Sequence, residues 1–350
     1  MGLRGRRRVK KERNLTFDVL NVLAIIGVIT LHHNGLVHSY KPGPGWVQSL
    51  VFECLFYCSV PVFMMLSGAN LLGYKDRYDT KTFLKKRLTR VAVPWLFWAA
   101  VFLTWRVFLL KDYVLEEPYW KSVTDAILNS KSTSVYWFFP ALIACYLAMP
   151  VLSSLRNNRR ILWYIVIINF LFHSCKPAIQ YFLDVKWSID APLGSSLLIF
   201  VVLGYLLTSK PPEKKDRRIL YILGAAGVLL RFFYTWYFSA KNGVTDTSIK
   251  GYAMFHSVFY ACAVFVALCR VNWNRILPEW LKKILPDLSA CSFGIFLIHR
   301  FIMHYEQQIL GLGNGSWAWR LVFIPVTYAV TLGVVWVIRK IPGGKWIVGG

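Results

Sequence analysis

The sequence predicts an all-α polytopic membrane protein, built as a bundle of about ten transmembrane helices. Of the 350 residues, 56% are hydrophobic and the mean hydropathy is +0.45, which is more apolar surface than a soluble core of this size can bury. Apolar runs long enough to cross about 30 Å of hydrocarbon recur along the whole chain. The 15 Trp, 18 Tyr and 24 Phe suit aromatic belts at both membrane interfaces.

The individual helices follow from apolar runs between charged or Pro- and Gly-rich breaks. The first run, 17–37, has a basic flank like that of a signal peptide, but it is too long and no small-residue cleavage site follows, so we expect it to be retained. We expect a basic tail at 1–14 and one transmembrane domain at 15–350. The remaining helices are expected at 47–72, 91–110, 135–154, 160–175, 194–208, 218–239, 252–269, 287–305 and 320–339.

Basic residues give the orientation, because short loops rich in Lys and Arg stay on the cytoplasmic side. Such loops alternate with loops of few or balanced charges, and an even helix count then places both termini in the cytoplasm. The formal net charge of +24 reflects this topology and an attraction to anionic lipid. Because the charge is spread over six segments, we do not expect nucleic-acid binding. These segments are the tail RGRRRVKKER and residues 75–90, 156–160, 210–218, 270–283 and 339–345.

The cysteines do not predict a metal centre. Cys54 and Cys58 lie four residues apart on one helix face and resemble a ligand pair, but no nearby His or second Cys pair completes a site. The other five also follow no metal-ligand spacing, and most lie inside expected helices as small apolar fillers. They are Cys145, Cys175, Cys262, Cys269 and Cys291.

All seven histidines fall in the half of the bundle that is expected to face outward. This distribution favours an outward-facing cavity rich in histidine; the alternative is that neutral imidazole simply tolerates membrane interfaces. They are His32, His33, His38, His173, His256, His299 and His304.

Ionisable residues inside a membrane are costly, so each is a candidate for function. Asp18 and the polar Asn21 lie at the inner end of the first helix. Glu53 lies near the expected depth of His32, where a carboxylate could hold an imidazole in one tautomer; capping a helix end or reaching the interface is the alternative. Arg231 lies near the middle of its helix and requires an anionic partner, either Glu53 or a bound anion.

Five stretches, in order along the chain, carry the motifs of one family. They are DVLNVLAIIGVITLH at 18–32, SVPVFMMLSGANLLG at 59–73, FLKKRLTRVAVPW at 83–95, YWFFPALIACYLAMPVLS at 136–153 and SACSFGIFLIH at 289–299. On these residues the chain resembles the membrane-bound acyltransferase-3 family, whose simplest members O-acetylate bacterial surface glycans. The resemblance implies transfer of an acyl group, which we expect to be acetyl, from cytoplasmic acyl-CoA to a hydroxyl on the outer face of the bacterial cytoplasmic membrane.

The resemblance also assigns roles to residues on the donor side. Arg87 and Arg90 match the family's R-x-x-R, and guanidinium groups suit the phosphates of acetyl-CoA; topology alone would also place arginines there. Where the family has an arginine eleven residues before its histidine, about 16 Å lower on the helix, this chain has Asn21. Arg231 could supply the missing cation. Val135 stands where the family often has a histidine, two residues before Trp137.

The family's essential histidine matches His32, which we take as the general base. A neutral imidazole can remove a hydroxyl proton during attack on a thioester. His33 points about 100° away around the helix and is the second choice. Glu53 would support the base, and the candidates for binding the glycan or glycolipid acceptor are His299, Trp137 and His256. A non-catalytic sensory module and a glycan exporter remain as alternatives; an exporter should show paired broken helices in two related halves, and no internal repeat is seen.

Overall fold

The structure is a computed structural model that describes residues 13–189, 191–192 and 194–349. Within these ranges every regular element is a helix, which confirms the predicted all-α class. Seven helical stretches are long and apolar enough to cross a membrane, and Leu198–Ser209 and Phe255–Arg270 are shorter apolar helices. The count of about ten spans and the cytoplasmic position of both termini stay predictions. The seven stretches are Leu15–His33, Pro44–Asp76, Thr80–Leu110, Ser134–Leu155, Arg159–Leu183, Lys214–Asn242 and Phe323–Lys340.

Most of the predicted basic tail, residues 1–12, lies outside the described part of the chain. The α-helices in chain order are α1 (Leu15–His33), α2 (Pro44–Phe56), α3 (Ser59–Leu71), α4 (Thr80–Thr104), α5 (Tyr119–Leu128), α6 (Phe138–Leu155), α7 (Arg159–Asn169), α8 (Lys176–Leu183), α9 (Leu198–Ser209), α10 (Lys214–Asn242), α11 (Phe255–Arg270), α12 (Trp273–Ile276), α13 (Glu279–Leu310), α14 (Trp317–Leu321), α15 (Phe323–Lys340) and α16 (Gly344–Val348). Short 3₁₀ turns at Gly35–His38, Tyr74–Asp76 and Ser134–Trp137, and π-helical turns at Trp105–Leu110 and Phe170–Cys175, join or extend them.

The helix expected at 47–72 is divided at Tyr57 and Cys58 into α2 and α3. Pro61 is the physical reason, because a proline has no N–H to donate and its ring crowds the carbonyl four residues earlier, here that of Tyr57. The division turns the side chain of Tyr57 into the bundle, where it is 7% exposed.

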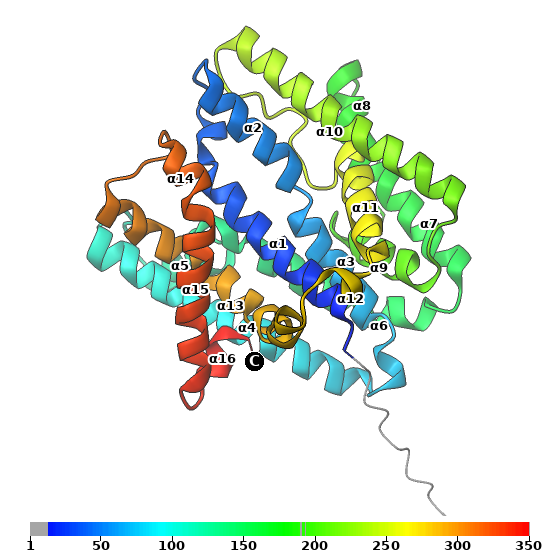
Figure 1. The fold of residues 1–350 in the computed structure, drawn as a ribbon, viewed down its shortest axis with the longest axis horizontal. Coiled ribbons are helices and arrows are strands. Elements are labelled where there is room, and N and C mark those ends of the chain that lie inside the picture. Colours follow the sequence, from blue (N-terminus) through cyan, green and yellow to red (C-terminus); the bar gives the residue numbers. More distant parts are fainter. Residues whose placement is uncertain (1–12, 190, 193, 350) are drawn as a thin grey trace, which may run out of the picture.

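Helix α1 crosses the middle of the molecule, with α15 on one side and α9 and α11 on the other (Figure 1). It starts after Asn14, whose side chain accepts a hydrogen bond from the Thr16 amide. Most of its residues are buried, as expected for a helix that is apolar on all faces. A helix in this position can present polar side chains to the interior at both of its ends.

Helix α13 runs beside α1 in the same direction. Near the start of α1, the amide nitrogen of Asn21 donates to the carbonyl and hydroxyl oxygens of Ser289, at 2.9 and 3.1 Å. Near its end, the ring centroids of His32 and His299 are 5.2 Å apart. The two contacts are separated by similar lengths of helix on α1 and on α13, so the two helices run side by side between them. Side chains of both helices can therefore line the same cavity.

Helix α4 carries the arginines of the R-x-x-R motif and has a defined start. The Asp79 carboxylate accepts hydrogen bonds from the amide and hydroxyl of Thr82, at 2.7 and 3.0 Å. These bonds lower the pKa of the Asp79 carboxyl below its ordinary value. The cap fixes the first turn of α4 and thereby the rotation at which Arg87 and Arg90 leave the helix.

Helices α3 and α9 approach each other at backbone contact through two glycines. An added Cβ on Gly68 would lie 1.8 Å from the Val201 carbonyl oxygen, and one on Gly204 would lie 2.0 Å from the Met65 carbonyl oxygen. Small residues allow this approach between membrane helices, where dispersion contacts replace the hydrophobic effect. No larger residue fits at either position without separating the helices.

We expect Gly68→Ala to lower the thermal unfolding temperature of the detergent-solubilised protein, because the new methyl group must push two backbones apart. Overpacking of this kind costs about 1–3 kcal/mol. Scanning fluorimetry measures the effect, and Gly333→Ala in α15 is the control, since a Cβ there meets nothing within 4 Å. An unfolding temperature for Gly68→Ala equal to that of the control would show that the contact does not support the fold.

Candidate active site

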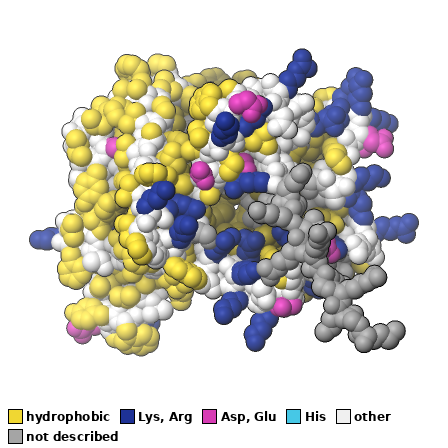
Figure 2. Space-filling model, turned by 60° about the horizontal axis from the view of Figure 1, so that its bottom comes forward, with side chains coloured by type: hydrophobic (Ala, Val, Ile, Leu, Met, Phe, Trp, Pro, Cys, Tyr) yellow, Lys and Arg dark blue, Asp and Glu magenta, His cyan; other side chains and the backbone are white. Residues whose placement is uncertain are grey.

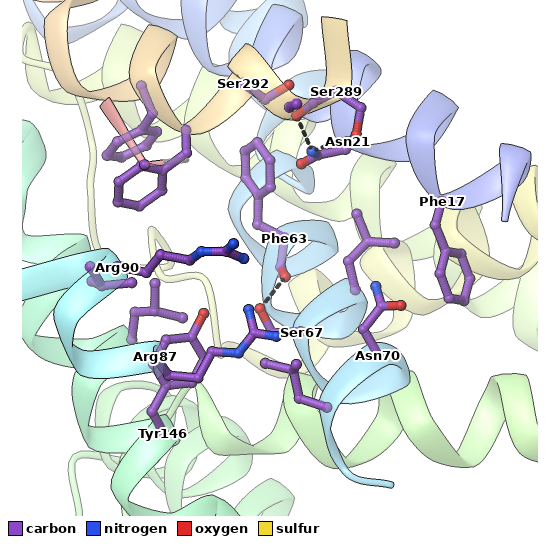
Figure 3. A pocket seen from close by; sticks show the side chains of 18 of the residues that line it. Phe17, Asn21, Phe63, Ser67, Asn70, Arg87, Arg90, Tyr146, Ser289 and Ser292 are labelled. Carbon is purple, nitrogen blue, oxygen red and sulfur yellow. Dashed lines mark hydrogen bonds between the residues drawn. The ribbon is translucent and has the colours of Figure 1, made fainter. Parts of the chain in front are cut away.

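A cavity of about 470 Å³ lies beside the first half of α1, between α3, α4, α6 and α13. We call it the arginine cavity, because Arg13, Arg77, Arg87 and Arg90 line it together with Asn21. In Figure 3, Arg87 and Arg90 extend from α4 toward Asn21 on α1 and toward Ser67 and Asn70 on α3. Figure 2, which brings this end of α1 forward, shows Lys and Arg side chains gathered around a hollow in the surface.

The arginine cavity has an excess of positive charge. Asp18 neutralises Arg13 through two hydrogen bonds, of 2.6 and 2.9 Å, and Arg13 also donates to the Pro286 carbonyl. In the described part of the chain, neither Arg87 nor Arg90 takes part in an ion pair. The buried Nε of Arg87 has no hydrogen-bond partner among the described residues. Guanidinium groups in this state suit a ligand with phosphate groups.

A second cavity, of about 320 Å³, lies beside the last turn of α1. We call it the histidine cavity, because His32 and His38 line it. Its wall also includes Glu53 from α2, Trp137 from the turn before α6, and the segment before α11. The structure thus brings His32, Glu53 and Trp137 together, three of the residues selected from the sequence.

His32 is partly exposed to the histidine cavity and has no hydrogen-bond partner among the described residues. The ring of His299 packs against it and is fully buried. Nδ1 of His299 lies 2.8 Å from the Phe296 carbonyl and 3.2 Å from that of Ile295, so this nitrogen carries the proton. The lone pair of His299 is then on Nε2, which has no partner among the described residues.

His33 is in a different position, because both of its ring nitrogens are already bonded and its ring is fully buried. Nδ1 lies 2.8 Å from the Trp319 carbonyl, which can only accept, so Nδ1 donates. Nε2 lies 2.8 Å from the hydroxyl of Thr327, which also bonds to the carboxyl group of Glu306.

The single hydroxyl proton of Thr327 allows two arrangements. If it goes to Glu306, then His33 is doubly protonated and donates to the hydroxyl oxygen; if it goes to His33, then Glu306 is protonated and donates instead. Neither arrangement leaves a lone pair on His33 for a substrate hydroxyl. Of the two residues, His32, the first choice from the sequence, keeps ring nitrogens without partners among the described residues beside a cavity, whereas His33 does not.

Glu53 lies in the histidine cavity but is bonded to two cations. Its Oε1 is 3.2 Å from Arg231 and 3.2 Å from Lys250. Glu53 and Arg231 are 5% and 4% exposed, and the guanidinium lies 3.7 Å from the centroid of the Tyr57 ring. No hydrogen bond joins Glu53 to His32 in the described structure, and Glu53 forms ion pairs at the wall of the cavity instead.

Arg231 has one of the two partners that the sequence analysis named for it, whereas His256 lies outside both cavities. Arg231 pairs with Glu53 and does not line the arginine cavity, so the structure does not bring it beside Asn21. His256 is buried, with Nε2 3.1 Å from the Ile249 carbonyl, and does not line the histidine cavity. Depth in the membrane, which the sequence indicates, does not say toward which neighbour a side chain turns.

Aromatic rings form one wall of the histidine cavity. Tyr57 and Tyr252 stack with centroids 4.0 Å apart and an angle of 6° between planes, and Trp137 continues the stack 5.3 Å beyond Tyr252. The Trp137 side chain is 40% exposed. Exposed ring faces beside charged and hydroxyl groups are typical of a surface that contacts both the apolar face and the polar edge of a ligand.

The sequence analysis missed Arg13, Arg77 and Tyr146 of the arginine cavity, and Lys250 and Tyr252 of the histidine cavity. All but Tyr146 lie outside the expected helices or at their first residue, where only general loop composition was visible. Among the described residues, no group of three or more His, Cys, Asp or Glu is placed to hold a metal ion.

Helices of membrane-spanning length around two cavities with charged lining residues indicate a multi-pass membrane protein with an internal site. The chain belongs to the acyltransferase-3 family: the family model, an acyltransferase domain, matches residues 14–339. The positions of Asn21, His32, Arg87 and Arg90 all lie within this match.

The chain is also similar to the nodulation protein NolL of two bacteria. With NolL of Mesorhizobium japonicum it shares 22% identity over 318 residues, which are 89% of this chain and 70% of that protein. With NolL of Sinorhizobium fredii it shares 26% identity over 145 residues, 41% of this chain and 37% of that protein. No solved structure matches the chain.

Proposed function

We propose that this membrane acyltransferase moves an acetyl group from acetyl-CoA, bound in the arginine cavity, to a hydroxyl group of a glycan in the histidine cavity. One observation carries the proposal. Cationic side chains and a histidine with unengaged ring nitrogens lie at opposite ends of α1, and the two cavities share a lining residue, Phe296. A donor with a charged end and a long neutral arm fits such an arrangement.

The residues have distinct tasks in the proposed reaction. Arg87 and Arg90 bind the phosphates of CoA, and Asn21 lies along the way toward His32, eleven residues further on α1. Neutral His32 takes the proton of the acceptor hydroxyl as its oxygen attacks the thioester carbonyl. The carbon–sulfur bond then breaks, and the proton passes from His32 to the departing thiolate of CoA. His299 orients the His32 ring.

The walls of the histidine cavity support a sugar as the acceptor. Trp137 and the stacked tyrosines offer ring faces to the apolar face of a sugar, while Lys250 and Ser134 offer hydrogen bonds to its hydroxyl groups. We infer a surface glycan or a lipid-linked glycan as the acceptor. With both termini in the cytoplasm of a bacterium, the arginine cavity would face the cytoplasmic supply of acetyl-CoA, and anionic lipids would surround the basic loops.

The purified protein in lipid nanodiscs tests this function directly. Incubation with acetyl-CoA and a glycan extract from the host envelope should release CoA thiol and add acetyl groups to the glycan, measured by mass spectrometry. Acetyl-CoA at 100 times its dissociation constant should stabilise the fold by about 2.7 kcal/mol. Stabilisation without transfer would indicate a sensory module. The absence of both stabilisation and transfer would indicate an exporter.

We expect Arg87→Ala to raise the KM for acetyl-CoA about tenfold or more and to reduce the thermal stabilisation by CoA, because a charge-assisted hydrogen bond contributes about 1.5–3 kcal/mol. Coupled thiol release gives the KM. Arg160→Ala is the matched control, since Arg160 is an exposed arginine at the start of α7 that lines neither cavity. Equal KM values for the two variants would remove Arg87 from the donor site.

A further inference from the structure

The boundary between the arginine cavity and the histidine cavity is formed at one aromatic side chain. Phe296 of α13 lines both cavities, although it is 5% exposed. Of the residues that line the two cavities, it is the one they share.

Close ring contacts hold Phe296 in this position. Its ring centroid lies 5.0 Å from that of Phe138 and 5.6 Å from that of Phe139, which are 5% and 0% exposed. On the other side it lies 5.8 Å from the ring of His299, which in turn packs on His32. Rings packed at these distances leave little free volume between the two cavities.

The position of Phe296 bears on which acyl group can react, an inference that rests on the proposed function. A donor that enters through the arginine cavity must bring its carbonyl carbon to this boundary in order to meet a hydroxyl beside His32. The acyl chain is bonded to that carbon, so its first carbon atoms lie against the rings of Phe296 and Phe138. A methyl group needs the least displacement of these rings, and each further methylene needs more.

We propose that Phe296 is the residue that restricts the donor to acetyl-CoA. The phenyl ring occupies the space that the longer chain of a propionyl or butyryl group would need. Where packed side chains close a pocket, substrates that differ by one methylene differ in kcat/KM by roughly 10- to 200-fold. Truncation of Phe296 opens this space and removes the discrimination, while the arginines that hold the phosphates of CoA stay in place.

The test compares kcat/KM for acetyl-CoA and butyryl-CoA in nanodiscs. For Phe296→Ala we expect the acetyl-to-butyryl ratio to fall at least tenfold from its wild-type value, and for Phe296→Leu an intermediate ratio. Phe301→Ala is the matched control, because Phe301 lies on the same helix and packs 4.9 Å from Trp105, but lines neither cavity. Its ratio should equal that of the wild type.

Two outcomes overturn the inference. A wild-type ratio in Phe296→Ala, when CoA still stabilises that variant, shows that the ring does not limit the acyl chain. An equal fall in Phe301→Ala shows that general loosening of α13 is responsible. If the wild-type protein transfers no acyl group to any acceptor in the envelope extract, the proposed function fails instead, so the two failures are distinguishable.

Discussion

Replacement of His32 by alanine is expected to reduce acyl transfer by about 10²- to 10⁴-fold, the usual contribution of a positioned general base. The imidazole of His32 has no hydrogen-bond partner among the described residues and borders the histidine cavity, so its removal takes away the group that we propose accepts the hydroxyl proton. Initial rates of CoA thiol release in nanodiscs measure the loss. Thermal unfolding should change little, because the side chain is partly exposed and makes no bond that must be replaced.

The matched control for His32 is His173→Ala. His173 lies in the π-helical turn Phe170–Cys175 and lines neither cavity, so the rate of transfer should stay within about twofold of wild type, as expected for a substitution away from a site. Full activity of His32→Ala at a normal protein level would remove His32 from the mechanism.

His33→Ala separates a structural role from a catalytic one. It deletes two buried hydrogen bonds, to Trp319 and Thr327, and should lower the unfolding temperature while the folded fraction keeps its turnover. A large loss of turnover in His33→Ala without a loss of stability would transfer the role of base to His33.

The fold class and part of the site could be predicted from the sequence because both depend on position along a membrane helix. Apolar runs predicted the all-α class, and depth alone predicted that His32 and Glu53 lie at one level. Pro61 also encodes the division of the helix at Tyr57. The sequence analysis missed this division because the run stays apolar on both sides of it, so hydropathy alone shows one continuous span.

What the sequence could not indicate is the neighbour that each side chain faces. Arg231 had the depth and charge to serve several partners, and only the packing of α10 against α2 directs it to Glu53. In the sequence, Arg13 and Arg77 look like the other basic residues of the loops. Membrane topology already accounts for the positive charge of all of these residues, so nothing singles out the two arginines. His32 and His33 differ by about 100° around one helix, and this rotation becomes informative only when α13 and α15 are in place.

The ion pair of Glu53 and Arg231 should have the largest effect on stability. Glu53→Gln leaves the guanidinium of Arg231 at 4% exposure, against the Tyr57 ring, without its carboxylate. Removal of one partner of a buried pair costs about 3–5 kcal/mol, because a buried charge remains uncompensated. Thermal and chemical unfolding in detergent should show this loss. The control is Glu279→Gln in the exposed pair with Lys282, where about 1 kcal/mol or less is expected.

The double variant Glu53→Gln/Arg231→Met distinguishes an uncompensated charge from lost packing. Methionine retains much of the apolar volume of the arginine stem, and no charge is left in need of a partner except Lys250, whose side chain is 30% exposed. The double variant should therefore be more stable than Glu53→Gln alone, a positive coupling that a double-mutant cycle measures. If the two substitutions simply add, or if Glu53→Gln is as harmless as Glu279→Gln, the pair does not hold α2 against α10. The shape of the histidine cavity would then depend on the stacked rings of Tyr57, Tyr252 and Trp137 alone.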